Sequence, residues 1–181
     1  MTIPNMITIL RVILVPIFVI YMINGRTLAS LVIFSIASFS DALDGFIARI
    51  FHQKSNLGAH LDPLVDKILL STAYITLAIF RLIPSWLAVL IISRDVIILL
   101  GVLVLYLTQY PVKIHPSVLS KATTCMQVAT VFIVLSNGYL DIQFLNPYAF
   151  WLAGLLTIAS GLQYIRIGLI ILSQGMNSNF T

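Results

Sequence analysis

Four of the six acidic residues in this 181-residue chain fall between positions 41 and 66, and the chain contains no glutamate. They form two pairs of carboxylates, Asp41 with Asp44 and Asp62 with Asp66. Spacings of three and four residues place the members of each pair on one face of a helix. The flanking residues are strongly apolar, and ionisable groups within a membrane are costly and usually functional. These aspartates are therefore the candidate centre of the protein's chemistry.

Two such helix faces set against each other would gather four carboxylates around one small volume. Four negative charges cannot all remain ionised in a low-dielectric pocket unless cations compensate them. An all-oxygen ligand set favours hard ions, so we expect two divalent ions, Mg²⁺ or Mn²⁺, rather than zinc. The small residues Gly45 and Ala48 leave room for a ligand near the backbone. Arg49 adds a planar cation suited to phosphate oxygens.

Each of these residues taken singly also has an ordinary structural explanation. Asp62 precedes Pro63 and could cap a helix that has proline in its first turn. Arg49 and Lys54 could be cationic anchors at the end of a span. A single carboxylate within a helix could serve a proton relay. The combination at this spacing is what favours a shared metal and phosphate site.

The composition is that of an integral membrane protein. Hydrophobic residues make up 60% of the chain and charged residues 9%, against roughly 25% charged residues in soluble domains. The mean hydropathy is +1.05. The formal charge of +4 is too small and too dispersed for nucleic-acid binding, and the single Cys125 excludes an intrachain disulfide. The length predicts a single transmembrane catalytic domain over residues 1–181.

Six segments are long and apolar enough to cross a bilayer, which takes about 20 residues. They cover residues 5–24, 27–50, 58–82, 84–107, 117–135 and 148–172. We predict an all-α protein of six transmembrane helices, the first of them retained and not cleaved as a signal peptide. The second span carries Asp41 and Asp44 in its later half, and the third carries Asp62 and Asp66 in its opening turns. The distribution of Lys and Arg agrees with cytoplasmic termini and a cytoplasmic-facing acidic cluster.

Other polar residues also interrupt the apolar spans. Arg94 and Asp95 lie near the middle of the fourth span. Adjacent residues do not face each other on a helix, so we expect that these two do not simply neutralise one another. Arg94 either forms an ion pair with another helix or binds a phosphate of an acceptor substrate. Lys121, at the start of the fifth span, either reaches the membrane surface or serves the same acceptor.

The first span has one polar face, made by Asn5, Thr8 and Arg11 at helical spacing. That face either closes the pocket above the acidic pairs or consists of ordinary polar groups at a helix end. Aromatic residues near the span ends fit an interfacial belt; they are Trp86, Tyr110, Tyr148 and Trp151.

The acidic stretch resembles the motif of the CDP-alcohol phosphatidyltransferase family. That motif reads Asp-x2-Asp-Gly-x2-Ala-Arg-x8-Gly-x3-Asp-x3-Asp, and the chain matches it at every defined position from Asp41 to Asp66. The resemblance implies a bundle of six transmembrane helices, a homodimer, and an active site that opens to the cytoplasm of a bacterium. It also implies transfer of the phosphatidyl group from the lipid CDP-diacylglycerol to an alcohol, with release of CMP.

The resemblance implies a role for each matched position. The metal ligands would be Asp41, Asp44, Asp62 and Asp66, and Asp66 would also be the general base for the acceptor hydroxyl. The residues expected to bind CDP-diacylglycerol are the motif positions Gly45, Ala48, Arg49 and Gly58, together with Asn5 and Thr8 of the polar face on the first span. The residues expected to bind the acceptor are Arg94, Lys121 and Arg11.

The acceptor is the less specific part of this prediction. The opening from Asn5 to Arg11 resembles phosphatidylglycerophosphate synthases, which use glycerol 3-phosphate. The segments around Arg94 and Lys121 also resemble the cardiolipin synthases of the family, which use phosphatidylglycerol, and Asp95 stands where many of the former carry glutamate. We expect glycerol 3-phosphate, with phosphatidylglycerol as the alternative. An ion or proton transporter fits poorly because no inverted repeat is visible, and an intramembrane prenyltransferase should be longer.

Overall fold

The computed structural model describes the backbone of residues 3–51, 58–107 and 117–178. Side chains are described for residues 9–40, 67–101, 103, 117–168 and 170. Within these ranges the chain is helical and forms no strand. Its elements are α1 (Ile3–Ile23), α2 (Thr27–Phe51), α3 (Gly58–Ile79), α4 (Ser85–Leu107), α5 (Val118–Ser136), the short 3-10 helix η1 (Gln143–Leu145) and α6 (Asn146–Ser178).

The α-helices coincide with the six predicted segments, so the all-helical prediction is confirmed. α3 ends three residues earlier than predicted, at Ile79, because Arg81 adopts a left-handed conformation with φ 57°. The backbone N–H of Arg81 bonds to Ala78 O at 3.0 Å, and that of Leu82 bonds to Leu77 O at 2.9 Å, which closes the helix end. α6 continues past the predicted end at residue 172, because polar residues outside the hydrocarbon can still extend a helix.

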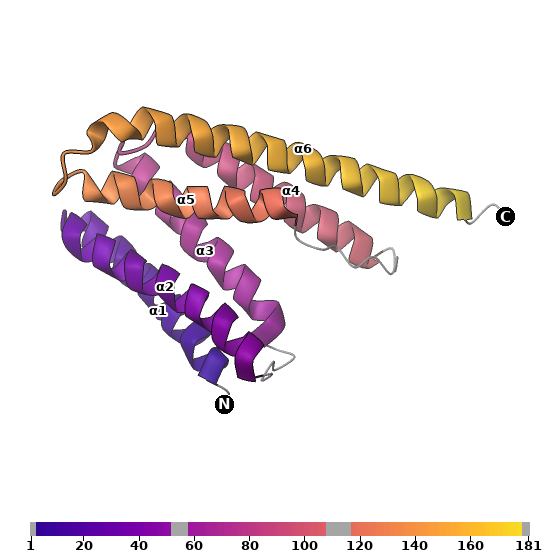
Figure 1. The fold of residues 1–181 in the computed structure, drawn as a ribbon, viewed down its shortest axis with the longest axis horizontal. Coiled ribbons are helices and arrows are strands. Elements are labelled where there is room, and N and C mark those ends of the chain that lie inside the picture. The colour runs from indigo at the N-terminus through magenta and orange to yellow at the C-terminus, as the bar shows by residue number, and fades with distance from the viewer. Residues whose placement is uncertain (1–2, 52–57, 108–116, 179–181) are drawn as a thin grey trace.

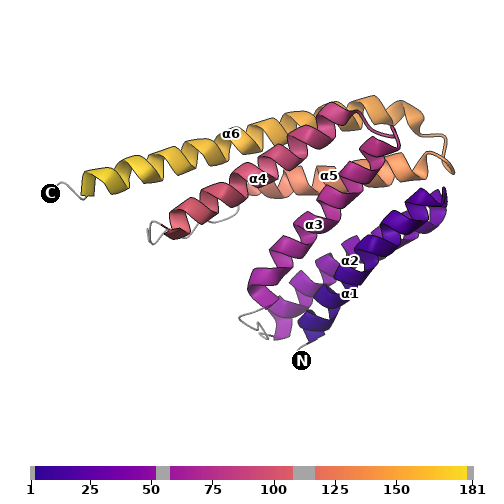
Figure 2. The same cartoon turned by 180° about the vertical axis from the view of Figure 1, so that it is seen from behind.

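The helices form two groups of three that diverge from a common end (Figure 1). α1, α2 and α3 make the first arm, and α4, α5 and α6 make the second arm. The connections α1–α2, α3–α4 and α5–α6 lie where the arms meet. The N-terminus and the C-terminus lie at the far ends of different arms, as the view from behind also shows (Figure 2).

The core lies near the end where the arms meet. Phe18 and Phe34 pack within the first arm with ring centroids 6.0 Å apart. Phe34 also packs edge-on against Phe132 of α5 at 5.3 Å, which joins the two arms. Close by, the hydroxyl of Tyr74 on α3 donates to the backbone oxygen of Gln127 on α5 at 3.0 Å.

Large apolar side chains cover the outside of the bundle. Val89 on α4 is 63% exposed, and Leu155 and Leu162 on α6 are 61% and 62% exposed. Soluble monomers rarely expose apolar surface on this scale, and a lipid-facing helix does so throughout. Two segments in the described part are long and apolar enough to cross a membrane, Val118–Ser136 and Gln143–Gly168. These features are those of a membrane protein.

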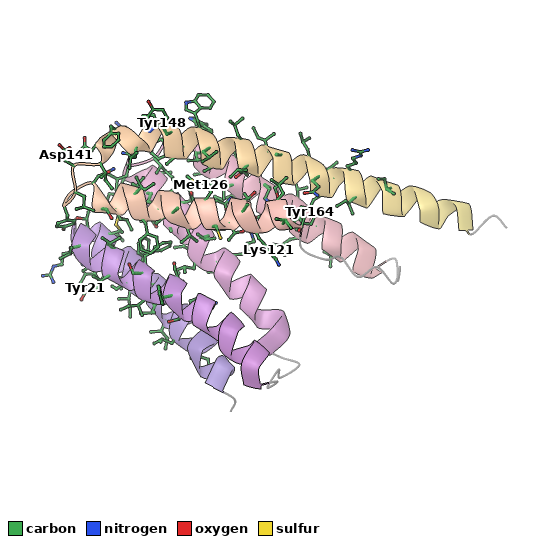
Figure 3. All side chains as sticks on the ribbon, viewed as in Figure 1. Tyr21, Lys121, Met126, Asp141, Tyr148 and Tyr164 are labelled. Atoms are coloured by element: carbon green, nitrogen blue, oxygen red, sulfur yellow. The ribbon has the colours of Figure 1, made fainter. Side chains whose placement is uncertain are left out.

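Aromatic residues gather at the end where the arms meet. The rings of Trp86 and Trp151 lie 5.5 Å apart and are tilted by 40°. Tyr148 is 74% exposed and lies on the outer side of α6 (Figure 3). Gly154 lets α6 approach this pair, because a Cβ atom there would stand 3.0 Å from Trp86 Cζ3. These positions support the predicted interfacial belt, although Tyr110 lies outside the described residues.

Replacing Arg81 by glycine should stabilise the protein by up to about 1 kcal/mol, because a residue with a Cβ atom pays a steric cost in the left-handed region. The measurement is the free energy of unfolding in mixed dodecyl maltoside and SDS micelles. Arg81→Ala retains the Cβ atom and should give no such gain. An equal gain from alanine would show that the charge of Arg81, and not its backbone, is responsible.

Candidate active site

The backbone places the two acidic pairs at matching positions in the first arm. From the start of α2 at Thr27, Asp41 and Asp44 lie about 21 and 26 Å along the helix axis. From the end of α3 at Ile79, Asp66 and Asp62 lie about 20 and 26 Å in the opposite chain direction. Thr27 and Ile79 both belong to the end where the arms meet (Figure 1). The four positions therefore stand at similar distances from that end, toward the far end of the first arm.

The side chains of the predicted metal and donor site are outside the described part of the structure. This applies to Asp41, Asp44, Asp62, Asp66, Gly45, Ala48, Arg49, Gly58, Asn5 and Thr8. Among the side chains that are described, no group of three or more His, Cys, Asp or Glu residues could hold a metal ion. The ligand set thus remains a prediction from spacing and from the family resemblance.

The described part of the site is an ion-pair cluster centred on Asp95 of α4. Its Oδ1 atom accepts from Lys67 Nζ of α3 at 2.6 Å and from Arg94 Nη1 at 2.7 Å. Arg94 and Asp95 are each 4% exposed. The expectation that adjacent Arg94 and Asp95 would not neutralise one another is wrong. Their Cα–Cβ bonds diverge around the helix, but the long, flexible arginine side chain reaches back to its neighbour.

Arg94 also joins the three helices of the second arm. Its Nη2 atom donates to Ser120 Oγ of α5 and to Ser160 Oγ of α6, both at 2.7 Å. Its guanidinium lies 5.9 Å from the ring centroid of Tyr164 on α6, within the range of a cation–π contact. The interhelical ion pair considered for Arg94 and Asp95 is present, but it joins Asp95 to Lys67, whereas Arg94 pairs within α4 and reaches α5 and α6 through hydrogen bonds.

A second set of polar contacts joins α5 to α6, nearer to the end where the arms meet. Gln127 Nε2 donates to Thr157 Oγ1 at 3.1 Å, and Thr157 Oγ1 donates in turn to Ala153 O at 2.6 Å. Thr123 Oγ1 lies 3.1 Å from Leu156 O. Buried polar side chains that bond across helices hold transmembrane bundles together. Buried polar contacts therefore join α5 to α6 in the second arm, in addition to those made by Arg94.

The other predicted acceptor residues differ in their surroundings. Lys121 is exposed and projects from α5 on the side where the first arm lies (Figure 3). Its neighbour Ser120 contacts Arg94, so the two cations belong to one region of the second arm. Arg11 lies on α1 in the first arm and is only 1% exposed. The structure brings Arg94 and Lys121 into one region and places Arg11 across from them in the first arm.

Sequence reasoning gave no role to Lys67, Ser120 or Ser160. A usable signal for Lys67 was present, because this cation directly follows Asp66 inside an apolar helix and requires a partner. Serine is common in packed transmembrane helices, so the two serines carried no comparable signal. Their contacts join residues 26 and 66 positions from Arg94, which helical periodicity does not reveal.

Ser160→Ala should destabilise the protein by about 1–3 kcal/mol, because one guanidinium hydrogen of Arg94 then loses its buried acceptor. Ser35→Ala is the matched control, since Ser35 Oγ bonds only to Leu31 O of its own helix. The free energy of unfolding in mixed micelles measures both. Equal losses in the two variants would contradict a specific role for the Arg94–Ser160 bond.

Comparison with known proteins places the chain among lipid-synthesising enzymes. The family model of CDP-alcohol phosphatidyltransferase matches residues 1–159. A protein of Bacillus subtilis named CDP-diacylglycerol--glycerol-3-phosphate 3-phosphatidyltransferase is 36% identical over 180 residues, which cover 89% of this chain and 92% of that protein.

Two further relatives are named as cardiolipin synthases. The human cardiolipin synthase (CMP-forming) is 34% identical, with 92% of this chain and 62% of the relative covered. A probable cardiolipin synthase (CMP-forming) of Drosophila melanogaster is also 34% identical, and the chain spans 57% of its length against 91% of its own. The extent of these matches, together with the motif from Asp41 to Asp66, shows that the chain belongs to the CDP-alcohol phosphatidyltransferase family.

Proposed function

We propose that this protein transfers the phosphatidyl group of CDP-diacylglycerol to glycerol 3-phosphate, giving phosphatidylglycerophosphate and CMP. The observation that carries the proposal is the complete family motif at the end of α2 and the start of α3. The two helices hold their acidic positions at similar distances from the end where the arms meet, as a shared site requires. The proposed setting is the cytoplasmic membrane of a bacterium, with six spans, cytoplasmic termini, a single catalytic domain and a homodimeric assembly.

The donor set fits a pair of divalent ions. Four carboxylates without thiolate or imidazole form a hard, all-oxygen ligand set, as Mg²⁺ or Mn²⁺ prefers. We assign the ligands to Asp41, Asp44, Asp62 and Asp66. Bound there, two such ions would supply charge neutralisation for the pyrophosphate and for the phosphate that leaves with CMP.

The chain's own residues would position the substrates and move one proton. Gly45, Ala48, Arg49 and Gly58 would hold the cytidine diphosphate, with Asn5 and Thr8 of α1 closing the pocket. Asp66 would accept the proton of the acceptor hydroxyl as the hydroxyl oxygen forms its bond to the phosphatidyl phosphorus. The bond between that phosphorus and the oxygen bridging it to CMP breaks, and CMP departs with the bond's electron pair. Positioning and one base are sufficient, because phosphoryl transfer needs little covalent work from the protein.

Glycerol 3-phosphate is the acceptor that the cations of the second arm favour. Its phosphate carries up to two negative charges and needs cations apart from Arg49, which the donor would occupy. Arg94 retains an Nε atom without a hydrogen-bond partner among the described atoms. Lys121 is exposed and directly follows Ser120, which Arg94 contacts, and Arg11 is buried in the first arm. The names of the bacterial relatives from Bacillus subtilis and Pseudomonas fluorescens agree with this acceptor.

Phosphatidylglycerol is the second candidate acceptor, since two of the relatives described above are cardiolipin synthases. It is itself a lipid with one phosphodiester charge, so it needs less cationic surface than glycerol 3-phosphate. The three basic residues that we assign to the acceptor therefore favour the smaller and more highly charged one.

Asp66→Asn should lower the release of CMP by about 10²–10⁴-fold, because the amide is nearly isosteric but cannot accept the proton. The affinity for CDP-diacylglycerol, measured by equilibrium binding to protein in nanodiscs, should change much less. An equal collapse of donor binding would show that Asp66 serves chiefly as a ligand and that the base lies elsewhere.

The acceptor is tested by giving the purified protein CDP-diacylglycerol with glycerol 3-phosphate, phosphatidylglycerol, inositol phosphate or serine in separate reactions. Mass spectrometry of the lipids should find phosphatidylglycerophosphate, and only with Mg²⁺ or Mn²⁺ present. Arg94→Ala should raise the KM for glycerol 3-phosphate far more than that for the donor.

The control for this assay is a chelated reaction, to which Mg²⁺ is then restored. Cardiolipin formed from phosphatidylglycerol, with no reaction of glycerol 3-phosphate, would overturn the acceptor and leave the transfer chemistry intact. Full activity after thorough chelation would overturn the metal site.

A further inference from the structure

The two arms are joined by a series of contacts that ends at Lys67. Nearest to the meeting end, the hydroxyls of Thr27 and Tyr139 lie 3.1 Å apart. Farther along come the ring contact between Phe34 and Phe132 and the hydrogen bond from Tyr74 to Gln127 O. The Lys67–Asp95 ion pair follows about 10 Å beyond Tyr74 along α3. Of these described contacts between the two arms, it is the one farthest from the meeting end.

The ion pair has the strength and the rigidity to control the separation of the arms. Lys67 Nζ and Asp95 Oδ1 are 2.6 Å apart, and the carboxylate is 5% exposed. Asp95 is fixed from behind, because Arg94 binds the same oxygen and is itself held by Ser120 and Ser160. In an apolar medium, removing one member of such a cluster leaves a buried charge without its full compensation, which is strongly unfavourable.

The placement of Lys67 connects this contact to the chemistry. Lys67 directly follows Asp66 on α3, and Asp62 lies one turn farther toward the start of the helix. Its partner Asp95 belongs to the second arm, which carries Arg94 and Lys121. Any change in the separation of the arms at Lys67 must therefore move the acidic positions of α3 relative to the acceptor cations.

We propose that the Lys67–Asp95 ion pair is a positioning element that sets the distance between the acidic arm and the cationic arm of the active site. Lys67 and Asp95 act through the neighbouring Asp66 and Arg94 and do not need to touch the reacting atoms. This inference rests on the proposed function for its catalytic consequence, whereas its structural consequence is independent of the substrate.

The structural test measures the separation of the arms directly. Spin labels are attached at position 39 of α2 and position 162 of α6 in a Cys125→Ser background, since Phe39 and Leu162 are 70% and 62% exposed. Double electron–electron resonance should give one narrow distance distribution for the parent protein. Lys67→Met removes the charge at similar length and should give a longer, broader distribution, whereas Lys67→Arg preserves the ion pair and should match the parent.

The functional test uses the same variants without labels. Electron paramagnetic resonance titration with Mn²⁺ should show about tenfold weaker binding in Lys67→Met, since loss of supporting contacts around a metal site weakens it 10–100-fold. kcat for CMP release should fall about 10²-fold, as expected for a misplacement of about 1 Å. KM for both substrates should change less than about threefold, because the residues that bind them are untouched.

The matched control is Tyr74→Phe, which removes another contact between α3 and the second arm without affecting a charge. It should leave the distance distribution, Mn²⁺ binding and kcat close to those of the parent. Asp95→Asn supplies a second route to the same result if Lys67→Met does not yield a monodisperse protein.

Two outcomes would overturn the proposal. The first is an unchanged distance distribution in Lys67→Met or Asp95→Asn, and the second is a rise in KM without a fall in kcat, which would make the pair a substrate-binding group. If the parent forms no lipid product with any acceptor, the proposed function fails, while the distance and Mn²⁺ measurements still decide the role of the ion pair.

Discussion

A charge buried in an apolar bundle must be compensated within the bundle, and the Arg94–Asp95 pair on α4 imposes that constraint on the helices around it. Asp95 takes a second cation from α3, and Arg94 takes hydroxyl acceptors from α5 and α6. Four of the six described α-helices are thereby tied to one point about halfway along α4. Apolar packing alone would allow these helices to slide, whereas ion pairs and hydrogen bonds in an apolar medium fix their register.

Asp95 and the aspartates of the motif differ in how their negative charge is compensated. The carboxylate of Asp95 is compensated by Arg94 on its own helix and by Lys67 of the first arm, so it does not require a metal ion. The side chains at the acidic positions of the first arm lie outside the described residues, and the proposed function assigns the compensation of their charge to divalent ions.

Hydropathy was sufficient to predict every α-helix, because each apolar run is long and is closed by Asn, Gly, Pro or a polar loop. The early end of α3 escaped prediction, because Arg81 is not a residue that normally marks a left-handed helix end. The motif placed Asp41 and Asp66 on two successive helices from spacing alone. The Lys67–Asp95–Arg94 cluster and the two-arm arrangement depend on contacts between distant residues, and periodicity within single helices contains no information on such pairings.

α6 is longer than the hydrocarbon core of a bilayer. Its 33 residues span about 50 Å, against a hydrocarbon core of about 30 Å. The apolar segment predicted from the sequence ends at residue 172, so residues 173–178 continue as helix for about 9 Å beyond it. This helical stretch lies at the far end of the second arm (Figure 1). A reporter fused after α6 would lie at the far end of the second arm, whereas one fused before α1 would lie at the far end of the arm that carries the acidic positions.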